Sequence, residues 1–317
     1  MKVLVYGCGV IGSYLTHILC MAGNDVTVSA RGKWKEILEA DGLRIRHHLQ
    51  RRETLDRPKV TEEITADERY DCVFAVMPYD KMRAALDALA AARSPIAVLV
   101  GNNISPEAMR AAVLEKTVCP KQVLFGFQMT AGKRDIGRRM AVCERLGRSG
   151  MDIGGLRALP DEPTRRTLER LFAGTGYRLN WQPDMRAYLI CHLALVLPIS
   201  YLAYACGTDL RRASAEQRGQ TRLATREAYA ALRGKGIPIL PEGGEKYFEP
   251  GACGMLMRLM YYALCRNRTI GDLVACEHCR NAAAEMAALD EAFQEIIADV
   301  PDALMPNWNA LRRASFS

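Results

Sequence analysis

The pattern of apolar and polar positions divides the chain into two parts. In the first part, short apolar runs alternate with helical patterns. Residues 2–6 are an apolar run typical of a buried parallel strand, residues 11–21 have the pattern of a helix, and residues 25–30 are a second, β-branched strand. Strands that alternate with helices predict an α/β fold built on a parallel sheet.

The alternation continues to residue 181. Further strands are predicted at residues 71–76, 96–100, 122–125 and 177–181, and further helices at residues 79–92, 106–114 and 164–173. Residues 44–52 alternate partially, which favours an exposed edge strand, and residues 133–137 are predicted to form a hairpin turn. Ligands of open α/β sheets bind outside the carboxyl ends of the strands, and Asn102 stands at such an end.

The second part begins near Asp184 and contains helical patterns only. Its breaks lie near Gly207, at residues 234–244 and at residues 250–254. Because no strand–helix–strand unit appears, residues 183–317 are predicted to form an all-helical domain.

A glycine motif follows the first strand directly. Its residues are Gly7-Cys8-Gly9-Val10-Ile11-Gly12, a G-x-G-x-x-G spacing between a strand and a helix. Gly7 permits the tight turn, Gly9 lets the backbone approach a pyrophosphate, and Gly12 lets the helix pack closely on the strand. We therefore expect residues 1–182 to be a Rossmann-type dinucleotide-binding domain in which this motif binds the cofactor.

The residue after the second strand indicates which dinucleotide binds. An acidic residue there would accept a hydrogen bond from the ribose 2′-hydroxyl of NAD, but the chain has Arg31, followed by Lys33 and Lys35. A guanidinium group can hold a 2′-phosphate through two hydrogen bonds. The sequence therefore favours NADP over NAD.

The charge distribution also indicates an anionic ligand in the first domain. The chain carries 43 Lys and Arg against 36 Asp and Glu, a formal net charge of +7. Residues 183–317 contain 15 of each kind, so the first 182 residues carry the whole excess. The apolar fraction of 49% and the charged fraction of 25% exclude a mainly disordered chain.

The eleven cysteines are an odd number, and many lie in hydrophobic runs. Free thiols in a reducing cytoplasm explain this better than a disulfide framework. Glycines interrupt the apolar run at the N-terminus, so we expect no signal peptide. Cys276, His278 and Cys279 suggest a metal site, but no second cysteine pair has a suitable spacing, so none is predicted.

Residues 187–206 form an uncharged segment of 20 residues, which is long enough to span a bilayer. The segment contains His192, Pro198 and Ser200, and no other segment resembles it. A buried central helix is the preferred interpretation, and a membrane span is the alternative.

These elements together resemble the ketopantoate reductase (2-dehydropantoate 2-reductase) family. The resemblance covers nearly the whole chain and rests on the order and spacing of the glycine motif, Arg31, Asn102 and residues 133–135, 153–154 and 184–187. It implies a nicotinamide-dependent reductase with a helical substrate or dimerisation domain.

In that family, a Lys on the helix that opens the second domain acts as general acid, and Asn residues follow one and two turns later. These positions fall on His192, Val196 and Ser200 of this chain. The family's later Ser and Glu positions fall on Gly254 and Ile270. The resemblance therefore implies a divergent member that lacks the usual catalytic Lys and Glu and reduces a carbonyl substrate other than ketopantoate.

His192 is the candidate catalytic acid, because hydride delivery to a carbonyl builds negative charge on its oxygen and a nearby proton donor lowers that barrier. Ser200 lies on roughly the same helix face and is a candidate to orient the substrate, and Asn102 is expected to contact cofactor and substrate. We expect a small-molecule carbonyl partner, with a homodimer as an option, and neither nucleic acid nor membrane. The alternative function is a non-catalytic NADP-binding sensor on the same fold, which needs no proton donor.

Overall fold

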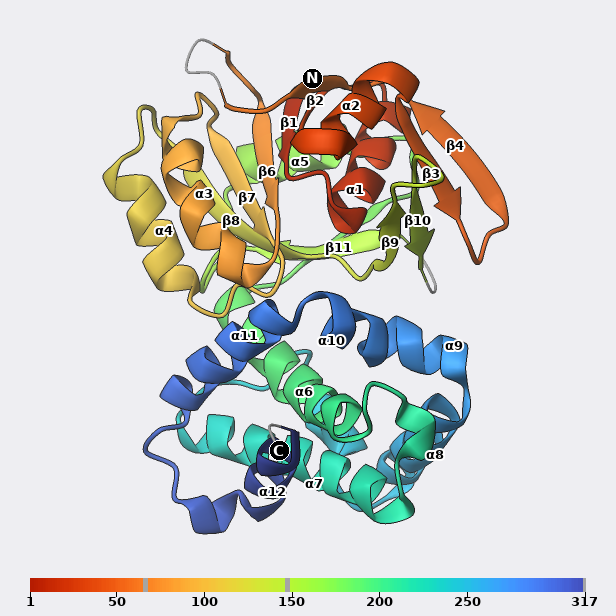
Figure 1. Cartoon of the computed structure of the whole chain (residues 1–317). Coiled ribbons are helices and arrows are strands. Elements are labelled where there is room, and N and C mark those ends of the chain that lie inside the picture. The colour runs from red at the N-terminus through yellow and green to blue at the C-terminus, as the bar shows by residue number, and fades with distance from the viewer. Residues whose placement is uncertain (65–67, 146–148, 316–317) are drawn as a thin grey trace. The chain divides into compact units, whose positions relative to one another are not determined.

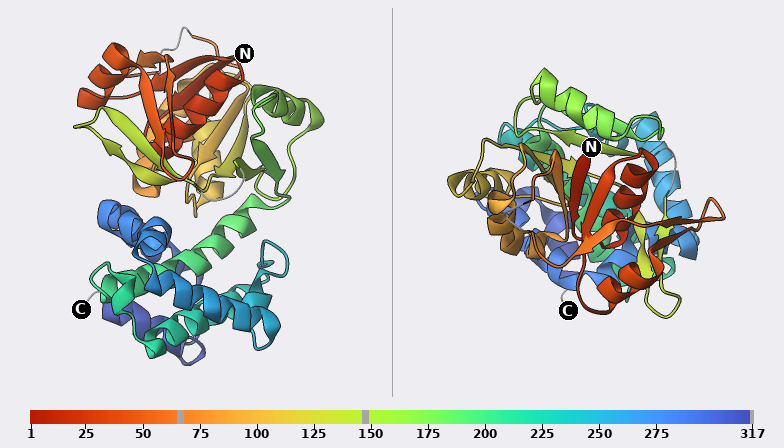
Figure 2. Two further views of the ribbon diagram at one scale, coloured as in Figure 1. Left: turned by 90° about the vertical axis from the view of Figure 1, so that its right-hand side faces the viewer. Right: turned by 90° about the horizontal axis from the view of Figure 1, so that it is seen from above.

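The computed structural model describes residues 1–64, 68–145 and 149–315. The chain divides into two compact units, Met1–Arg186 and Ala187–Ser317 (Figure 1). The sequence pattern predicts this boundary after residue 182. The predicted fold class is confirmed, because a mainly parallel α/β unit is followed by a helical unit. Figure 2 shows the same elements from two further sides.

An eight-stranded sheet forms the centre of the first unit, in the order β12-β11-β8-β7-β6-β1-β2-β5. Its strands are β1 (Lys2–Tyr6), β2 (Asp25–Ser29), β5 (Lys59–Thr61), β6 (Cys72–Val76), β7 (Ile96–Val100), β8 (Gln122–Phe127), β11 (Gly150–Gly154) and β12 (Arg178–Trp181). All neighbours are parallel except β8 and β11. Every residue of β6 and β7 is apolar and buried, as expected for strands that are covered on both faces.

The helices of the first unit lie close to their predicted positions, except α2, which the sequence pattern does not predict. They are α1 (Val10–Met21), α2 (Gly32–Asp41), α3 (Tyr79–Ala91), α4 (Pro106–Glu115) and α5 (Glu162–Leu171). α1 is buried continuously from Gly12 to Leu19, because it packs on β1 and β2 of the large sheet and on strands of a second, smaller sheet.

The smaller sheet is absent from the sequence prediction. It has the order β4-β3-β10-β9, with β3 (Leu43–His47), β4 (Arg52–Asp56), β9 (Ala131–Asp135) and β10 (Met140–Glu144). The single edge strand predicted at residues 44–52 is wrong, because β3 is an inner strand that ends in a turn before β4. Residues 133–135 belong to β9, so the hairpin turn begins only at Ile136.

The second unit consists of helices and short helical turns. They are α6 (Met185–Ala205), η1 (Leu210–Arg212), α7 (Ala215–Gly234), η2 (Gly244–Tyr247), α8 (Ala252–Arg266), α9 (Arg268–Gly271), η3 (Asp272–Cys276), α10 (Glu277–Asn281), α11 (Ala283–Ile296), η4 (Asp302–Leu304) and α12 (Pro306–Ser315). The helical segment from Asp272 to Ile296 is not continuous. It begins as one π-helical segment, η3, and the backbone of Ala282 leaves helical geometry between α10 and α11.

α6 contains the uncharged segment. It is the one helix in the described ranges that is long and apolar enough to cross a membrane, and 78% of its most apolar 18-residue stretch is buried inside the structure. This burial agrees with the interpretation of a central helix. The cytoplasmic location stays a prediction.

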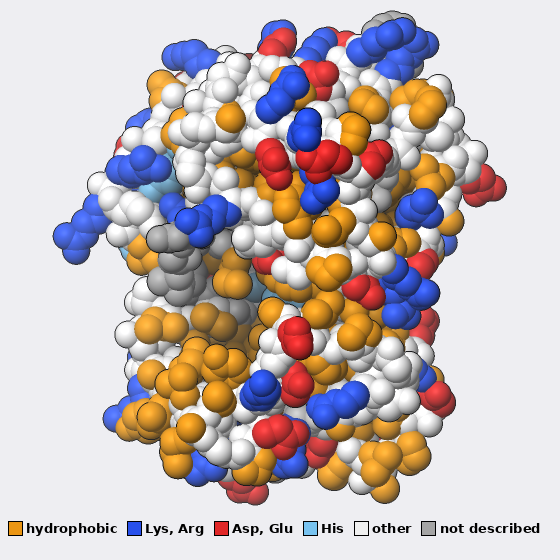
Figure 3. All heavy atoms as spheres, turned by 180° about the vertical axis from the view of Figure 1, so that it is seen from behind, with side chains coloured by type: hydrophobic (Ala, Val, Ile, Leu, Met, Phe, Trp, Pro, Cys, Tyr) orange, Lys and Arg blue, Asp and Glu red, His pale blue; other side chains and the backbone are white. Residues whose placement is uncertain are grey.

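α8 has apolar side chains on its exposed side as well as on its buried side. The exposed set is between 49% and 59% accessible and comprises Met255, Leu256, Leu259, Met260 and Tyr262. Figure 3 shows hydrophobic side chains gathered on this part of the helical unit, at the lower left of the view. The buried face is narrow and consists of Gly254, Tyr261 and Cys265.

Candidate functional site

The glycine turn between β1 and α1 is closed by backbone contacts that leave no room for side chains. Gly7 has a φ of +111°, and a Cβ on it would lie 2.2 Å from the carbonyl oxygen of Val76. A Cβ on Gly12 would lie 2.0 Å from the carbonyl oxygen of Gly7. Gly9 differs, because a Cβ there would meet nothing within 4 Å. The turn is therefore rigid at Gly7 and Gly12 and open at Gly9, which suits a group that approaches the backbone from outside.

The second motif residue, Cys8, ties this turn to the end of β2. Its backbone N–H donates to the carbonyl of Ser29 at 3.1 Å. Its side chain is 4% exposed and lies 3.5 Å from the hydroxyl oxygen of Ser13, and burial raises the pKa of the thiol. The backbone N–H and the thiol of Cys8 therefore both have partners within the first unit, and its role in binding a cofactor stays a prediction.

A polar residue that the sequence analysis missed supports the start of α1. Gln128 is buried, and its amide donates to the carbonyl of Ile11 at 3.4 Å and to Thr130 at 3.2 Å. Its carbonyl accepts a hydrogen bond from the hydroxyl of Tyr177 at 2.6 Å. Because Gln128 directly follows β8, its place at the carboxyl end of a parallel strand is the signal that could have identified it.

Arg31 stands at the N-terminus of α2, two residues after the end of β2. Its side chain is exposed and forms no ion pair in the part of the chain that the structure describes. Lys35 differs, because its ammonium group lies 3.1 Å from Glu62 and 3.7 Å from Glu39. Of these two cations, Arg31 is therefore the one whose charge is available to a ligand.

Arg134 is a second cation near α2 that the sequence analysis did not select. It projects from β9, and its guanidinium lies 6.0 Å from the ring centre of Trp34 on α2. The predicted turn at residues 133–137 begins too early and concealed its position, since the pairing of β9 with β10 puts Arg134 in a strand.

Asn102 lies on the turn after β7, at the same edge of the sheet as the glycine motif. The backbone N–H of Gly101 donates to Gly126, and the hydroxyls of Tyr79 and Ser105 lie 2.9 Å apart and connect the loops after β6 and β7. Met77 lies close to Gly7 and to Gly101. A Cβ added to Gly7 would lie 3.7 Å from the Cε of Met77, and a Cβ added to Gly101 would lie 3.0 Å from the carbonyl oxygen of Met77. The structure therefore brings the loops after β1, β6 and β7 together.

His192 and Ser200 lie on α6 in the second unit and face α10. Burial lowers the pKa of His192 to about 4, and the electrostatic interaction with nearby His278 acts in the same direction. The imidazole is therefore neutral at pH 7, so it can donate a hydrogen bond but carries no positive charge. Ser200 is 3% exposed, and its hydroxyl donates to the carbonyl of Val196 at 2.9 Å. Its role in orienting a substrate stays a prediction.

The Cys276–Cys279 segment has structural partners. Both thiols are 1% exposed, and burial raises the pKa of each. The Nε2 atom of His278 lies 3.3 Å from a carboxylate oxygen of Glu285, which is itself buried. Within the described residues, no group of three His, Cys, Asp or Glu side chains could hold a metal ion.

Residues 3–137 match the sequence family described as ketopantoate reductase PanE/ApbA. This part of the chain is therefore similar to ketopantoate reductases. The reductases of this family act on a carbonyl and hydroxyl pair and use a nicotinamide cofactor. No curated protein matches the sequence.

Solved ketopantoate reductase structures have the same fold over the full chain. The PanE/ApbA family enzyme from Ralstonia eutropha JMP134 has a TM-score of 0.72 at 18% identity and covers 100% of this chain and 99% of its own. A probable 2-dehydropantoate 2-reductase from Bacillus subtilis has a TM-score of 0.67 at 12% identity and covers 99% and 100%. A D-mandelate dehydrogenase solved with NADH and anilino(oxo)acetate has a TM-score of 0.62 at 15% identity and covers 93% and 99%.

Replacing Gly12 with Ala is expected to destabilise the first unit. The new Cβ would overlap the carbonyl of Gly7, and overpacking of this kind costs about 1–3 kcal/mol in the free energy of unfolding. Gly9→Ala is the matched control, with an expected cost below about 1 kcal/mol, because its Cβ meets nothing and only the helix cap changes. Urea denaturation of both variants checks this, and equal costs would contradict the packing described.

The imidazole of His192 is expected to titrate with a midpoint near pH 4 in an NMR experiment on the intact chain. Its folded pKa lies below the ordinary value of about 6.5, so the unfolded chain binds this proton more readily. The contribution of His192 to stability is therefore lost as the pH falls from about 6.5 to about 4, and His192→Gln should remove that contribution. A midpoint near 6.5 would show that the ring is not buried.

Proposed function

We propose that the protein is an NADPH-dependent oxidoreductase that reduces a 2-oxo acid or a similar carbonyl compound other than ketopantoate. The observation that carries the proposal is the closed glycine turn next to Arg31, whose guanidinium has no ion pair within the described ranges. The relationship to ketopantoate reductases and D-mandelate dehydrogenase supports the reaction class.

In this proposal, the backbone of the glycine motif from Gly7 to Gly12 binds the pyrophosphate. The first N–H groups of α1 have no partner inside the helix and form an anion site there. Arg31 binds the 2′-phosphate, and its position one residue after Ala30 places it beyond the end of β2. Once bound, the nicotinamide supplies the hydride. A D-mandelate dehydrogenase of the same fold binds NADH, so cofactor choice is the sharpest test.

His192 contributes a neutral N–H that hydrogen-bonds the carbonyl oxygen as negative charge develops there. A neutral imidazole is a weaker acid than imidazolium but needs no acidic medium to act as donor. The resemblance places an Asn at the position of Val196, where an apolar side chain would leave a polar substrate group without a partner. The presence of Val196 in place of that Asn is the reason for proposing a substrate other than ketopantoate.

Replacing Arg31 with Ala is expected to remove most of a preference for NADPH over NADH. A lost charge-assisted hydrogen bond costs roughly 1.5–3 kcal/mol, or about 10- to 100-fold in NADPH affinity, and NADH affinity should change little. Lys35→Ala is the matched control with a small effect, because Glu62 and Glu39 already neutralise that ammonium. Fluorescence titration of both cofactors checks this. Equal affinities in the unmodified protein would refute the assignment of NADPH.

NADPH oxidation with a panel of 2-oxo acids tests the reaction itself. We expect turnover with at least one compound, a loss of about 10²–10⁴-fold in His192→Ala, and nearly unchanged NADPH affinity in that variant. Tight NADPH binding without turnover on any compound would favour the sensor instead. Undiminished turnover in His192→Ala would assign His192 a structural role only.

A further inference from the structure

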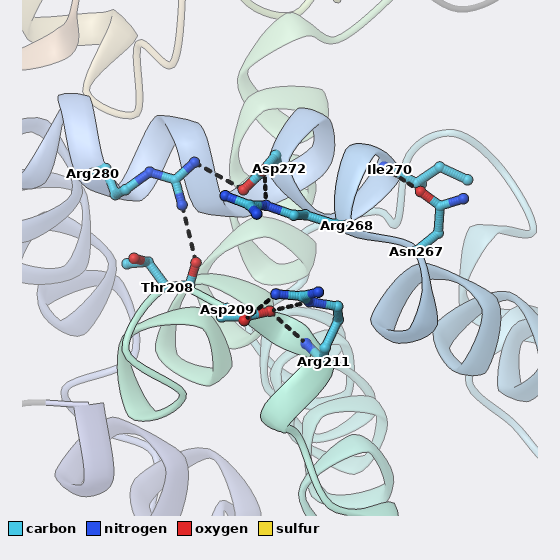
Figure 4. A network of polar contacts seen from close by, with 8 residues as sticks. All are labelled: Thr208, Asp209, Arg211, Asn267, Arg268, Ile270, Asp272 and Arg280. Carbon is cyan, nitrogen blue, oxygen red and sulfur yellow. Dashed lines mark hydrogen bonds and ion pairs between the residues drawn. The ribbon is translucent and has the colours of Figure 1, made fainter.

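A small polar cavity lies within the helical unit. It has a volume of about 100 Å³ and lies where the loop after α6 and η1 meet the segment from Asn267 to Arg280 (Figure 4). Its lining residues are Thr208, Asp209, Leu210, Arg211, Asn267, Arg268, Gly271, Asp272, Cys276 and Arg280. Neither His192 nor Ser200 belongs to this set.

The charged residues of the cavity are three arginines and two aspartates. Arg211 makes two hydrogen bonds to the carboxylate of Asp209, at 2.9 and 2.7 Å. Arg280 donates to Asp272 at 2.8 Å and to the carbonyl of Thr208 at 3.0 Å. The second oxygen of Asp272 lies 3.6 Å from Arg268. Two carboxylates therefore form ion pairs with three guanidinium groups, which leaves one positive charge in excess.

The arginines also have hydrogen-bonding capacity left over. A guanidinium carries five N–H donors, and within the described residues the side chains of Arg211 and Arg280 use two each, while Arg268 makes one long ion pair. The aspartate side chains are recessed, at 27% and 29% exposure. The arginine side chains are more accessible, at 48%, 74% and 42% for Arg211, Arg268 and Arg280.

This arrangement suits the recognition of an anion. The recessed carboxylates hold the guanidinium groups in place, and like charges around one cavity repel each other unless a negative group lies between them. Carboxylate and phosphate oxygens match the planar donor fork of arginine. We propose that this cavity, which we call the arginine pocket, binds the carboxylate or phosphate group of a small ligand.

The arginine pocket does not depend on the proposed reductase activity. It lies within the second unit, whereas the glycine turn and Arg31 belong to the first. Its volume accommodates a single oxyanion group rather than a dinucleotide. A cofactor phosphate and a ligand of the arginine pocket can therefore be distinguished by variants in different units.

Isothermal titration of the full chain with inorganic phosphate and with malonate tests the proposal. We expect at least one anion to bind, and Arg268→Gln to weaken that binding about 10-fold or more, because one charge-assisted contact is lost. Arg268 is 74% exposed and its ion pair is long, so this variant should stay folded. Binding of malonate alone identifies a carboxylate site, and binding of phosphate alone identifies a phosphate site.

Two control variants make the result specific. Arg258→Gln removes an exposed arginine of α8 that does not line the cavity, and Arg31→Ala removes the cation proposed for the cofactor. Arg258→Gln should bind the anion as the unmodified chain does, and the weakening caused by Arg268→Gln should persist when Arg31→Ala is also present. Absence of binding to the unmodified chain, equal weakening in Arg258→Gln, or a loss in Arg31→Ala but not in Arg268→Gln would each overturn the proposal.

Discussion

The close approach of Gly12 to the carbonyl of Gly7 is the contact on which the first unit depends. It holds the start of α1 against the end of β1, so the first N–H groups of the helix point out of the carboxyl edge of the sheet. The hydrogen bond from the backbone N–H of Cys8 to the carbonyl of Ser29 also holds the turn against the end of β2. Arg31 follows that strand directly, so one backbone contact positions both the proposed anion site and the backbone of Arg31.

The smaller sheet completes this arrangement by covering α1 from the other side. Its strands β9 and β10 contact the helix, and the thiol of Cys143 on β10 approaches the carbonyl of Val10 at 3.9 Å. Gln128 lies in the connection between β8 and β9, and its side-chain amide donates a hydrogen bond to the carbonyl of Ile11. Because α1 is enclosed in this way, the geometry of the glycine turn does not depend on a ligand to order it.

Local patterns in the sequence predict most parallel strands, most helices and the glycine turn, because each is encoded within about ten neighbouring residues. They do not predict β5 and β11. The smaller sheet could not be predicted in this way, since β3 pairs with β10 almost a hundred residues later and local alternation does not specify a partner. The same limit applies to Arg134 beside Trp34 and to the arginine pocket, where residues 208–211 meet residues 267–280. The neutral state of His192 follows from burial, which the sequence does not quantify.

In the proposed function, the nicotinamide cofactor binds at the glycine turn. Hydrogen–deuterium exchange of the full chain with and without NADPH tests it most directly. The account predicts that NADPH slows exchange in peptides covering residues 7–13 and 30–34, because the N–H groups at the start of α1 acquire phosphate acceptors and Arg31 becomes ordered. Protection confined to other segments, with no change in residues 7–13, would contradict the account.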